Sequence, residues 1–247
     1  MCGIVGYIGA RDATPIILNG LKRLEYRGYD SAGVAVINGD QLEVRKDAGK
    51  LSQLIDLVEK SPIAGAPGVG HTRWATHGAP NARNAHPHLG QTKRVVVVQN
   101  GIVENFLELK DELTAEGVEF QSETDTETIV HLVEHYLATG IGLVEAARKT
   151  FNQIRGANVV VLISADEPDK IVTARIGNAG GVVIGMGEGE NFIASDTPAI
   201  MDHTRNVIFL ESRQMAVVTR DTVTLETLDG TEVKAQAHND TLAPSAD

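Results

Sequence analysis

The sequence contains very little cysteine. Cys2 is the single cysteine among 247 residues, so no disulfide can form within the chain. A lone cysteine is typical of a reducing compartment, where the thiol stays available for chemistry. The first twelve residues, MCGIVGYIGARD, lack the basic start and long apolar centre of a secretion signal. We therefore expect a cytoplasmic protein.

Long apolar runs and an excess of positive charge are also missing. No apolar stretch reaches the roughly 20 residues that span a bilayer, so we expect no membrane association. The formal net charge is -11, with 22 Lys and Arg against 33 Asp and Glu. A surface this acidic repels phosphate backbones, which makes nucleic acid a poor partner. The hydrophobic content of 42% is ordinary for a globular protein with one large core.

Apolar periodicity predicts strands at both ends of the chain and helices between them. Strands are expected at residues 3–8, 32–37, 41–46 and 95–98, and then at 159–164, 171–176, 181–184, 191–194, 207–210, 215–219 and 223–228. Helices are expected from Thr14-Pro15 onward and at residues 51–60, 104–116, 122–138 and 143–153. This order favours one α+β domain with large antiparallel sheets.

Two segments are predicted to lack regular structure. Residues 75–93 form a long loop, a feature that is uncommon in compact domains unless the loop has a function. The small polar residues from about 235 onward are expected to be frayed. We therefore place the domain at residues 1–240 and treat 241–247 as a tail or the start of a linker.

Cys2 is a candidate nucleophile. Removal of Met1 would expose the thiol and a free α-amine on the same residue. An α-amine has a pKa of about 8 and can accept a proton near neutral pH. A nucleophile paired with its own terminal amine is an established alternative to a Ser-His-Asp triad. Taken alone, a cysteine that stands at position 2 by chance is the simpler interpretation.

Seven motifs carry a family resemblance. In chain order they read MCGIVGYIG, LEYRGYDSAG, HTRWATHG, NAHPH, QNGIVEN, SETDTE and ENFIASD. Together they resemble the amino-terminal glutaminase domain of the glucosamine-6-phosphate synthase family (glutamine–fructose-6-phosphate aminotransferase, isomerising), over essentially the whole chain. The resemblance implies the N-terminal-nucleophile hydrolase fold, a four-layer α/β/β/α sandwich of antiparallel sheets.

The resemblance implies that Asn100 and Gly101 are the oxyanion donors. Acyl transfer needs preorganised donors aimed at the negative charge that develops on oxygen. An Asn amide beside a Gly backbone N–H supplies such a pair, and Gly allows the substrate to approach closely. The alternative is a type I′ hairpin turn, for which Asn-Gly is a strong signal.

The same match assigns the charged ends of glutamine to Arg73 and Asp125. The planar guanidinium of Arg73 suits the α-carboxylate, because it can bind both oxygens. The carboxylate of Asp125 suits the α-ammonium. The alternatives are a surface arginine and a helix N-cap aspartate, and Asp125 could both cap and bind.

Further roles follow from the same resemblance. Thr76 and His77 are expected to contact the substrate. Trp74 is expected to gate an ammonia passage in a loop that closes over glutamine, with core packing as the alternative. Arg27 is expected to support the region around the nucleophile.

No metal or cofactor is expected. The sequence from His131 to His135 matches H-x-x-E-H, an inverted zinc-protease pattern, but it lies in a predicted helix. The remaining histidine group, His71, His77, His86 and His88, lacks structural-zinc spacing and has no cysteine partner. Residues 185–189 resemble a nucleotide loop, but do not complete the pattern and suit a hairpin turn.

The sequence thus predicts hydrolysis of L-glutamine to glutamate and ammonia through a Cys2 thioester. The resemblance implies a partner, the sugar-phosphate isomerase domain, which these 247 residues do not contain, and a homo-oligomeric full-length enzyme. Gln99 departs from the family, which usually carries histidine there. The alternative function is a non-catalytic glutamine-binding regulatory module with the same fold.

Overall fold

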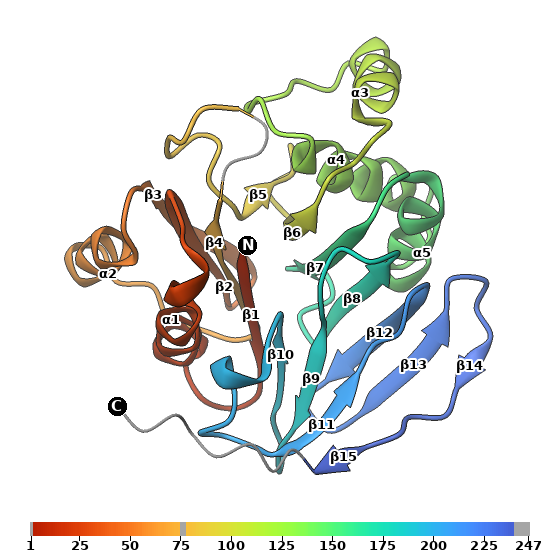
Figure 1. Cartoon of the computed structure of the whole chain (residues 1–247). Coiled ribbons are helices and arrows are strands. Elements are labelled where there is room, and N and C mark those ends of the chain that lie inside the picture. Colours follow the sequence, from red (N-terminus) through yellow and green to blue (C-terminus); the bar gives the residue numbers. More distant parts are fainter. Residues whose placement is uncertain (1, 75–77, 240–247) are drawn as a thin grey trace.

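The computed structural model describes residues 2–74 and 78–239. Two antiparallel sheets face each other and form the centre of the molecule (Figure 1). The first sheet has eight strands in the order β15-β11-β9-β10-β1-β4-β2-β3. These strands are β1 (Gly3–Ile8), β2 (Ser31–Asn38), β3 (Gln41–Ala48), β4 (Gly68–Arg73), β9 (Val183–Met186), β10 (Asn191–Ala194), β11 (Asn206–Phe209) and β15 (His238–Asn239).

The second sheet has seven strands in the order β14-β13-β12-β8-β7-β6-β5. Its strands are β5 (His88–Leu89), β6 (Val95–Gly101), β7 (Asn158–Ser164), β8 (Lys170–Ile176), β12 (Gln214–Thr219), β13 (Val223–Thr227) and β14 (Glu232–Val233). Every strand pairing among the described residues is antiparallel.

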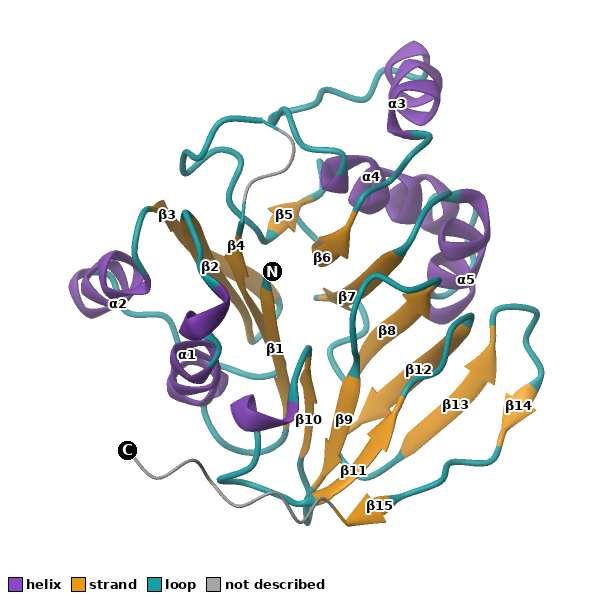
Figure 2. Cartoon of the chain, in the orientation of Figure 1, coloured by secondary structure: helices purple, strands orange, loops and turns teal. Residues whose placement is uncertain are grey.

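Helices cover the outer face of each sheet (Figure 2). The first sheet carries α1 (Ala13–Arg23) and α2 (Leu51–Lys60), and the second carries α4 (Thr126–Leu137) and α5 (Leu143–Gln153), with α3 (Phe106–Ala115) packed on α4. Short 3₁₀ turns lie at η1 (Glu25–Arg27) and η2 (Thr197–Ala199). Three apolar clusters separate the four layers. The predicted α+β fold, a four-layer α/β/β/α sandwich, is confirmed.

Strand β6 shows how burial on two faces selects its sequence. Val95 and Val97 pack against the helices that cover the second sheet, whereas Val96 and Val98 face the first sheet. A strand buried on both faces needs apolar residues without alternation, and β-branched side chains suit that environment. The sequence therefore signals both the strand and its central position.

Helix boundaries agree with the sequence in some places and differ in others. Residues 51–60 and 143–153 form α2 and α5 as predicted. The sequence suggests Thr14 as the cap of α1, but the helix begins at Ala13, and the Asp12 side chain caps it by accepting a hydrogen bond from the Thr14 N–H. The Thr14 hydroxyl donates instead to the carbonyl oxygen of Ile63.

The C-terminal segment differs from its prediction. The sequence predicts fraying from residue 235 onward, but His238 and Asn239 pair with β11 as the edge strand β15. Within the described ranges, none of the helices combines the length and apolar character needed to cross a bilayer.

The close packing of α1 on β4 depends on a residue without a side chain. A Cβ atom on Gly70 would lie 2.3 Å from the Cγ2 atom of Ile17. Overpacking of this kind destabilises a core, since side chains or backbone must move to relieve it. Gly70 therefore sets how closely α1 approaches the strand that leads into Arg73.

We predict that Gly70→Val lowers the free energy of unfolding by about 1–3 kcal/mol, because α1 must move away from β4. Urea unfolding followed by circular dichroism measures the change. Gly142→Ser is the control: Gly142 is the N-cap of α5, where serine is favoured, and a Cβ atom there would meet its nearest neighbour at 3.5 Å, so stability should not fall. Equal stability of Gly70→Val and the parent would contradict the packing argument.

Candidate active site

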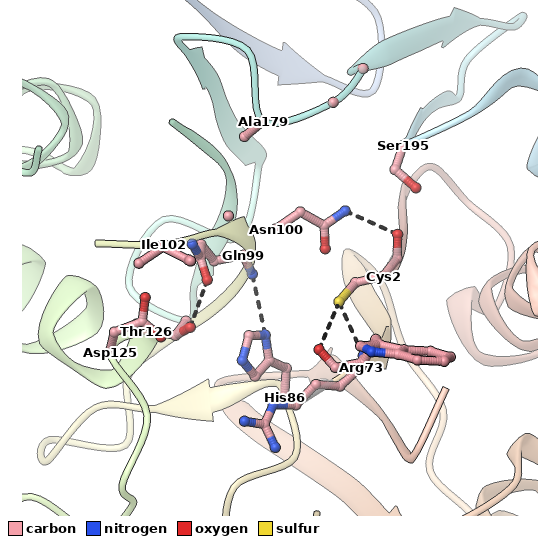
Figure 3. A pocket seen from close by; sticks show the side chains of 14 residues that line it. Cys2, Arg73, His86, Gln99, Asn100, Ile102, Asp125, Thr126, Ala179 and Ser195 are labelled. Carbon is pink, nitrogen blue, oxygen red and sulfur yellow. Dashed lines mark hydrogen bonds between the residues drawn. The ribbon is translucent and has the colours of Figure 1, made fainter. Parts of the chain in front are cut away.

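The ends of β1, β4 and β6 converge on one pocket of about 370 Å³. Figure 3 shows this pocket, with Cys2 on one side and Asp125 on the other. Six of the site residues predicted from the sequence line it, namely Cys2, Arg73, Trp74, Asn100, Gly101 and Asp125. These residues lie far apart in sequence and are brought together by the two facing sheets.

Three other predicted residues are not placed. Thr76 and His77 lie outside the described residues. Arg27 ends the 3₁₀ turn η1, and its side chain lies outside the described part of the chain. Their expected roles therefore stay predictions.

The Cys2 thiol is held by the backbone at the end of β4. The Trp74 N–H donates to Cys2 Sγ at 3.1 Å, and Sγ lies 3.6 Å from the Trp74 carbonyl oxygen. Burial raises the pKa of the Cys2 thiol, although the backbone hydrogen bond from Trp74 opposes the shift. A raised pKa keeps the thiol protonated at neutral pH, so a nucleophile at this position needs a base.

The chain that follows Cys2 is fixed on both sides. The Gly3 N–H donates to Thr72 Oγ1 at 3.1 Å, and the Ile4 N–H donates to Ser195 Oγ at 3.0 Å. The Ser195 N–H in turn donates to the Ile4 carbonyl at 3.0 Å. Ser195 lies inside one of the seven sequence motifs, but its position in the pocket could not be read from its residue type.

Asn100 and Gly101 belong to a strand and not to a hairpin turn. Asn100 pairs with Val159, and Gly101 pairs with Asn158, at the end of β6. Gly101 has φ +127°, and a Cβ atom there would lie 2.1 Å from the Ala157 carbonyl oxygen. The hairpin alternative is therefore wrong, and the glycine is required by both backbone conformation and space.

The side chain of Asn100 contacts both Cys2 and His71. Asn100 Nδ2 donates to the Cys2 carbonyl oxygen at 3.2 Å. Asn100 Oδ1 lies 2.9 Å from His71 Nε2. The amide is thus held at two points beside the candidate nucleophile.

Three buried histidines lie behind Asn100. The rings of His71 and His86 stack with centroids 4.2 Å apart, and His88 meets His86 edge-on at 4.8 Å. Burial lowers the pKa of His71 to about 4 and holds the pKa values of His86 and His88 well below the usual value. The sequence did not distinguish these rings from other histidines, because only the fold shows that they are buried together.

Gln99 is buried in a neutral hydrogen-bond network. Its Nε2 donates to Asn158 Oδ1 at 2.6 Å, and its Oε1 accepts from the Thr126 hydroxyl at 2.7 Å. The side chain therefore links β6 to β7 and to the first residue of α4. Both ends of the Gln99 amide have a partner, so its burial is compensated.

Arg73 and Asp125 place opposite charges at the pocket. Arg73 is 4% exposed at the end of β4, so the alternative of a surface arginine is wrong. The Asp125 side chain makes no capping hydrogen bond to α4, and its Oδ2 accepts from the Val103 N–H at 2.7 Å. The N-cap alternative for the Asp125 carboxylate is therefore also wrong.

The Trp74 ring lies at the mouth of the pocket. Its exposed fraction is 56%, which argues against the alternative of core packing. The ring rests on Gly28, where a Cβ atom would lie 2.3 Å from Trp74 Cζ3. Gly28 of the LEYRGYD motif thus makes room for the ring.

The H-x-x-E-H segment does not converge on one point. His131 is buried with Nε2 3.3 Å from Glu127 Oε1, whereas His135 Nδ1 lies 2.8 Å from Glu116 Oε2. In residues 2–74 and 78–239, no group of three or more His, Cys, Asp or Glu side chains is arranged to hold a metal ion. The predicted hairpin is present between β9 and β10, but residues 187–190 close it, because Gly185 and Met186 still belong to β9.

The comparisons with known proteins define the family. Residues 71–202 match the model of the glutamine amidotransferase domain. The matched region includes the second half of β4, all of β6 and the start of α4, and therefore most of the described pocket. The chain belongs to the glutamine amidotransferase domain family.

Two curated relatives of the chain carry the same name. The chain is 50% identical over 233 residues to glutamine–fructose-6-phosphate aminotransferase (isomerizing) from Thermococcus kodakarensis, covering 94% of this chain and 38% of the relative. It is also 50% identical over 237 residues to the enzyme of the same name from a strain of Thermus thermophilus, with 96% and 38% coverage. The chain thus spans 38% of the length of these relatives.

Solved structures support the fold. Glutamine phosphoribosylpyrophosphate amidotransferase from B. subtilis, complexed with ADP and GMP, superposes with a TM-score of 0.79 at 25% identity. The match covers 92% of this chain and 49% of that one. A glutamine aminotransferase class-II domain protein from Silicibacter pomeroyi superposes with a TM-score of 0.63 at 13% identity, which supports the fold alone.

The buried histidines predict a loss of stability in mild acid. A histidine whose folded pKa is lowered binds a proton more readily when unfolded, so stability is full above the unfolded pKa of about 6.5 and falls as pH drops toward the folded value. For His71, with a folded pKa of about 4, the loss at pH 5 is about 2 kcal/mol. His131 acts in the opposite sense: burial lowers its pKa, but Glu127 and Glu134 raise it overall.

We therefore predict a lower free energy of unfolding at pH 5 than at pH 7, measured by urea unfolding. His86→Phe removes one buried imidazole and should reduce this difference in the free energy of unfolding, because one histidine fewer then gains a proton on unfolding at pH 5. His238→Gln, which changes an exposed histidine on the edge strand β15, is the control and should leave the difference unaltered. Equal stability of the parent at pH 5 and pH 7 would contradict the prediction.

Proposed function

We propose that this chain hydrolyses the side-chain amide of L-glutamine, with Cys2 as the nucleophile. The observation that carries the proposal is the single pocket in which a cysteine thiol, an Asn-Gly donor pair and opposite charges meet. A non-catalytic glutamine-binding module needs the charged pair but has no use for a thiol beside an amide donor. Hydrolysis accounts for all of these groups.

The reaction proceeds through a thioester. Cys2 Sγ attacks the γ-carbonyl carbon and gives up its proton to a base. The carbon–nitrogen bond breaks, and ammonia leaves with a proton returned by that base. Water then adds to the γ-glutamyl thioester, the carbon–sulfur bond breaks, and glutamate and the free thiol are released.

The proposed base is the α-amine of Cys2, which exists only after Met1 is removed. An α-amine with a pKa of about 8 matches a proton transfer near neutral pH. A thiol that is mostly protonated near neutral pH needs such a base to become the attacking thiolate. Removal of Met1 therefore exposes the nucleophile and creates the base in the same step.

The proposed oxyanion donors are Asn100 Nδ2 and the Gly101 N–H. Both residues lie at the end of β6, and Asn100 Nδ2 is already 3.2 Å from the Cys2 carbonyl oxygen. Arg73 would hold the α-carboxylate of glutamine and Asp125 its α-ammonium. Thr76, His77 and Trp74 are proposed further substrate contacts, with Trp74 gating ammonia, and Arg27 is proposed to support the nucleophile region.

The similarity to the curated relatives supports a larger role. In a full-length enzyme of this kind, ammonia would pass to a sugar-phosphate isomerase domain and convert fructose-6-phosphate to glucosamine-6-phosphate. We place this enzyme in the cytoplasm as a homo-oligomer, with residues 1–240 as the glutaminase domain and 241–247 as a tail or linker.

The test is glutamate release from glutamine by purified protein whose intact mass shows that Met1 is absent. Cys2→Ala should abolish release, because no other residue replaces the thiol, and should leave the circular dichroism spectrum unchanged. Cys2→Ala should still bind glutamine in calorimetry. Glutamine binding by the parent without turnover would favour the regulatory module, and turnover by Cys2→Ala would exclude the mechanism.

Asp125→Asn isolates the proposed contact with the α-ammonium. The amide oxygen of asparagine can still accept from the Val103 N–H, so the local fold is kept while the charge is lost. Hydrogen bonds to charged groups contribute about 1.5–3 kcal/mol, so we predict an increase of about 10–100-fold in KM for glutamine.

Glutaramate, the analogue of glutamine without the α-ammonium group, is the matched control substrate. The parent and Asp125→Asn should hydrolyse it with the same kcat/KM, because the contact is absent in both. An unchanged KM for glutamine in the variant would show that Asp125 does not bind the ammonium.

A further inference from the structure

The side chain of His71 contacts the side-chain oxygen of Asn100, one of the two proposed oxyanion donors. It lies on β4 in the first sheet, whereas Asn100 lies on β6 in the second. His71 Nε2 is 2.9 Å from Asn100 Oδ1 and 3.1 Å from the Gln99 carbonyl oxygen. The histidine side chain has no exposed surface, and it is not among the residues that line the pocket.

The hydrogen bonds determine which way the Asn100 amide faces. The Cys2 carbonyl oxygen can only accept, so the Asn100 atom 3.2 Å from it must be the Nδ2 donor. Asn100 Oδ1 must then be the atom that faces His71. The orientation of the amide is thus fixed by the partners at both of its ends.

The same reasoning fixes the proton on His71. The Gln99 carbonyl oxygen also can only accept, so His71 Nε2 must carry a hydrogen that both oxygens share. Burial lowers the pKa of His71 to about 4, so the ring is neutral and Nδ1 is unprotonated at pH 7. Nδ1 has no hydrogen-bond partner among the described residues, which agrees with this tautomer.

The orientation matters because an asparagine amide has two opposite ends. With Nδ2 toward Cys2, the amide presents hydrogens to the γ-carbonyl oxygen as negative charge develops there. After a flip of 180°, it would present Oδ1, which repels that charge. The two hydrogens on Nδ2 allow one to meet the Cys2 carbonyl oxygen and the other to meet the substrate.

We propose that His71 is a positioning residue, which holds Asn100 Oδ1 so that Asn100 Nδ2 faces the oxyanion. This inference rests on the proposed function. His71 does not touch the substrate, and it acts through Asn100 alone. Its neighbour His86 stacks on the ring at 4.2 Å and fixes the plane in which the N–H points.

The experiment compares steady-state glutaminase kinetics of the parent, His71→Phe and His71→Gln. His71→Phe keeps an aromatic ring against His86 but removes the N–H donor. Loss of one oxyanion-hole donor lowers kcat by about 10²–10³-fold, and we expect a loss of this order with KM changed by less than about threefold. His71→Gln retains a donor near the Nε2 position and should recover at least about tenfold of that loss.

The Asn100→Ala background separates positioning from a general structural effect. If His71 acts through Asn100, adding His71→Phe to Asn100→Ala should lower kcat by less than about threefold further. His88→Phe is the matched control, because His88 is also buried but its Nε2 meets Thr124 Oγ1 at 2.9 Å and not Asn100. It should keep kcat within about threefold of the parent.

Three results would overturn the inference while leaving the proposed function intact. The first is that His71→Phe keeps a kcat within about threefold of that of an active parent. The second is that His71→Phe lowers kcat as much in the Asn100→Ala background as in the parent, and the third is that His71→Gln recovers none of the kcat lost in His71→Phe. Failure of His71→Phe to fold, with His71→Met failing as well, would assign His71 to folding and also overturn it. An inactive parent with Met1 removed would instead refute the proposed function.

Discussion

The hydrogen bonds of Asn100 join the two sheets at the point where the pocket opens. Asn100 extends from β6 in the second sheet, and its amide meets Cys2, which precedes β1, and His71 on β4, both on the side of the first sheet. A buried polar group that loses its hydrogen-bond partner costs free energy, so these hydrogen bonds between the sheets fix how the strand ends face each other. The position of the thiol relative to the donor pair depends on it.

A largely neutral interior keeps the polar site stable within the sandwich. His86 and Gln99, which line the pocket, and His71, which lies behind it, are buried without charge, and the hydrogen bonds of Gln99 are satisfied by neighbouring side chains. Among the acidic and basic side chains, only those of Arg73 and Asp125 line the described pocket. Such a site can bind a small zwitterion without leaving isolated charges in the core.

The sequence predicted much of the fold because apolar periodicity and chain order are local properties. The Val95–Val98 run and the helices at 51–60 and 143–153 needed no tertiary information. The pairing of His238 and Asn239 was missed, since an edge strand can form from polar residues when a partner such as β11 is present. Asn100 and Cys2 were named from motifs, but the supporting role proposed for His71 was not, because its contact with Asn100 joins two different sheets.

The most direct measurement of the central claim is mass spectrometry of the protein quenched in acid during turnover of glutamine. The account predicts a γ-glutamyl group on the N-terminal peptide, attached to the Cys2 sulfur and removed by hydroxylamine, on a chain that lacks Met1. Glutamate release with no adduct on Cys2, or release by a chain that retains Met1, would contradict it.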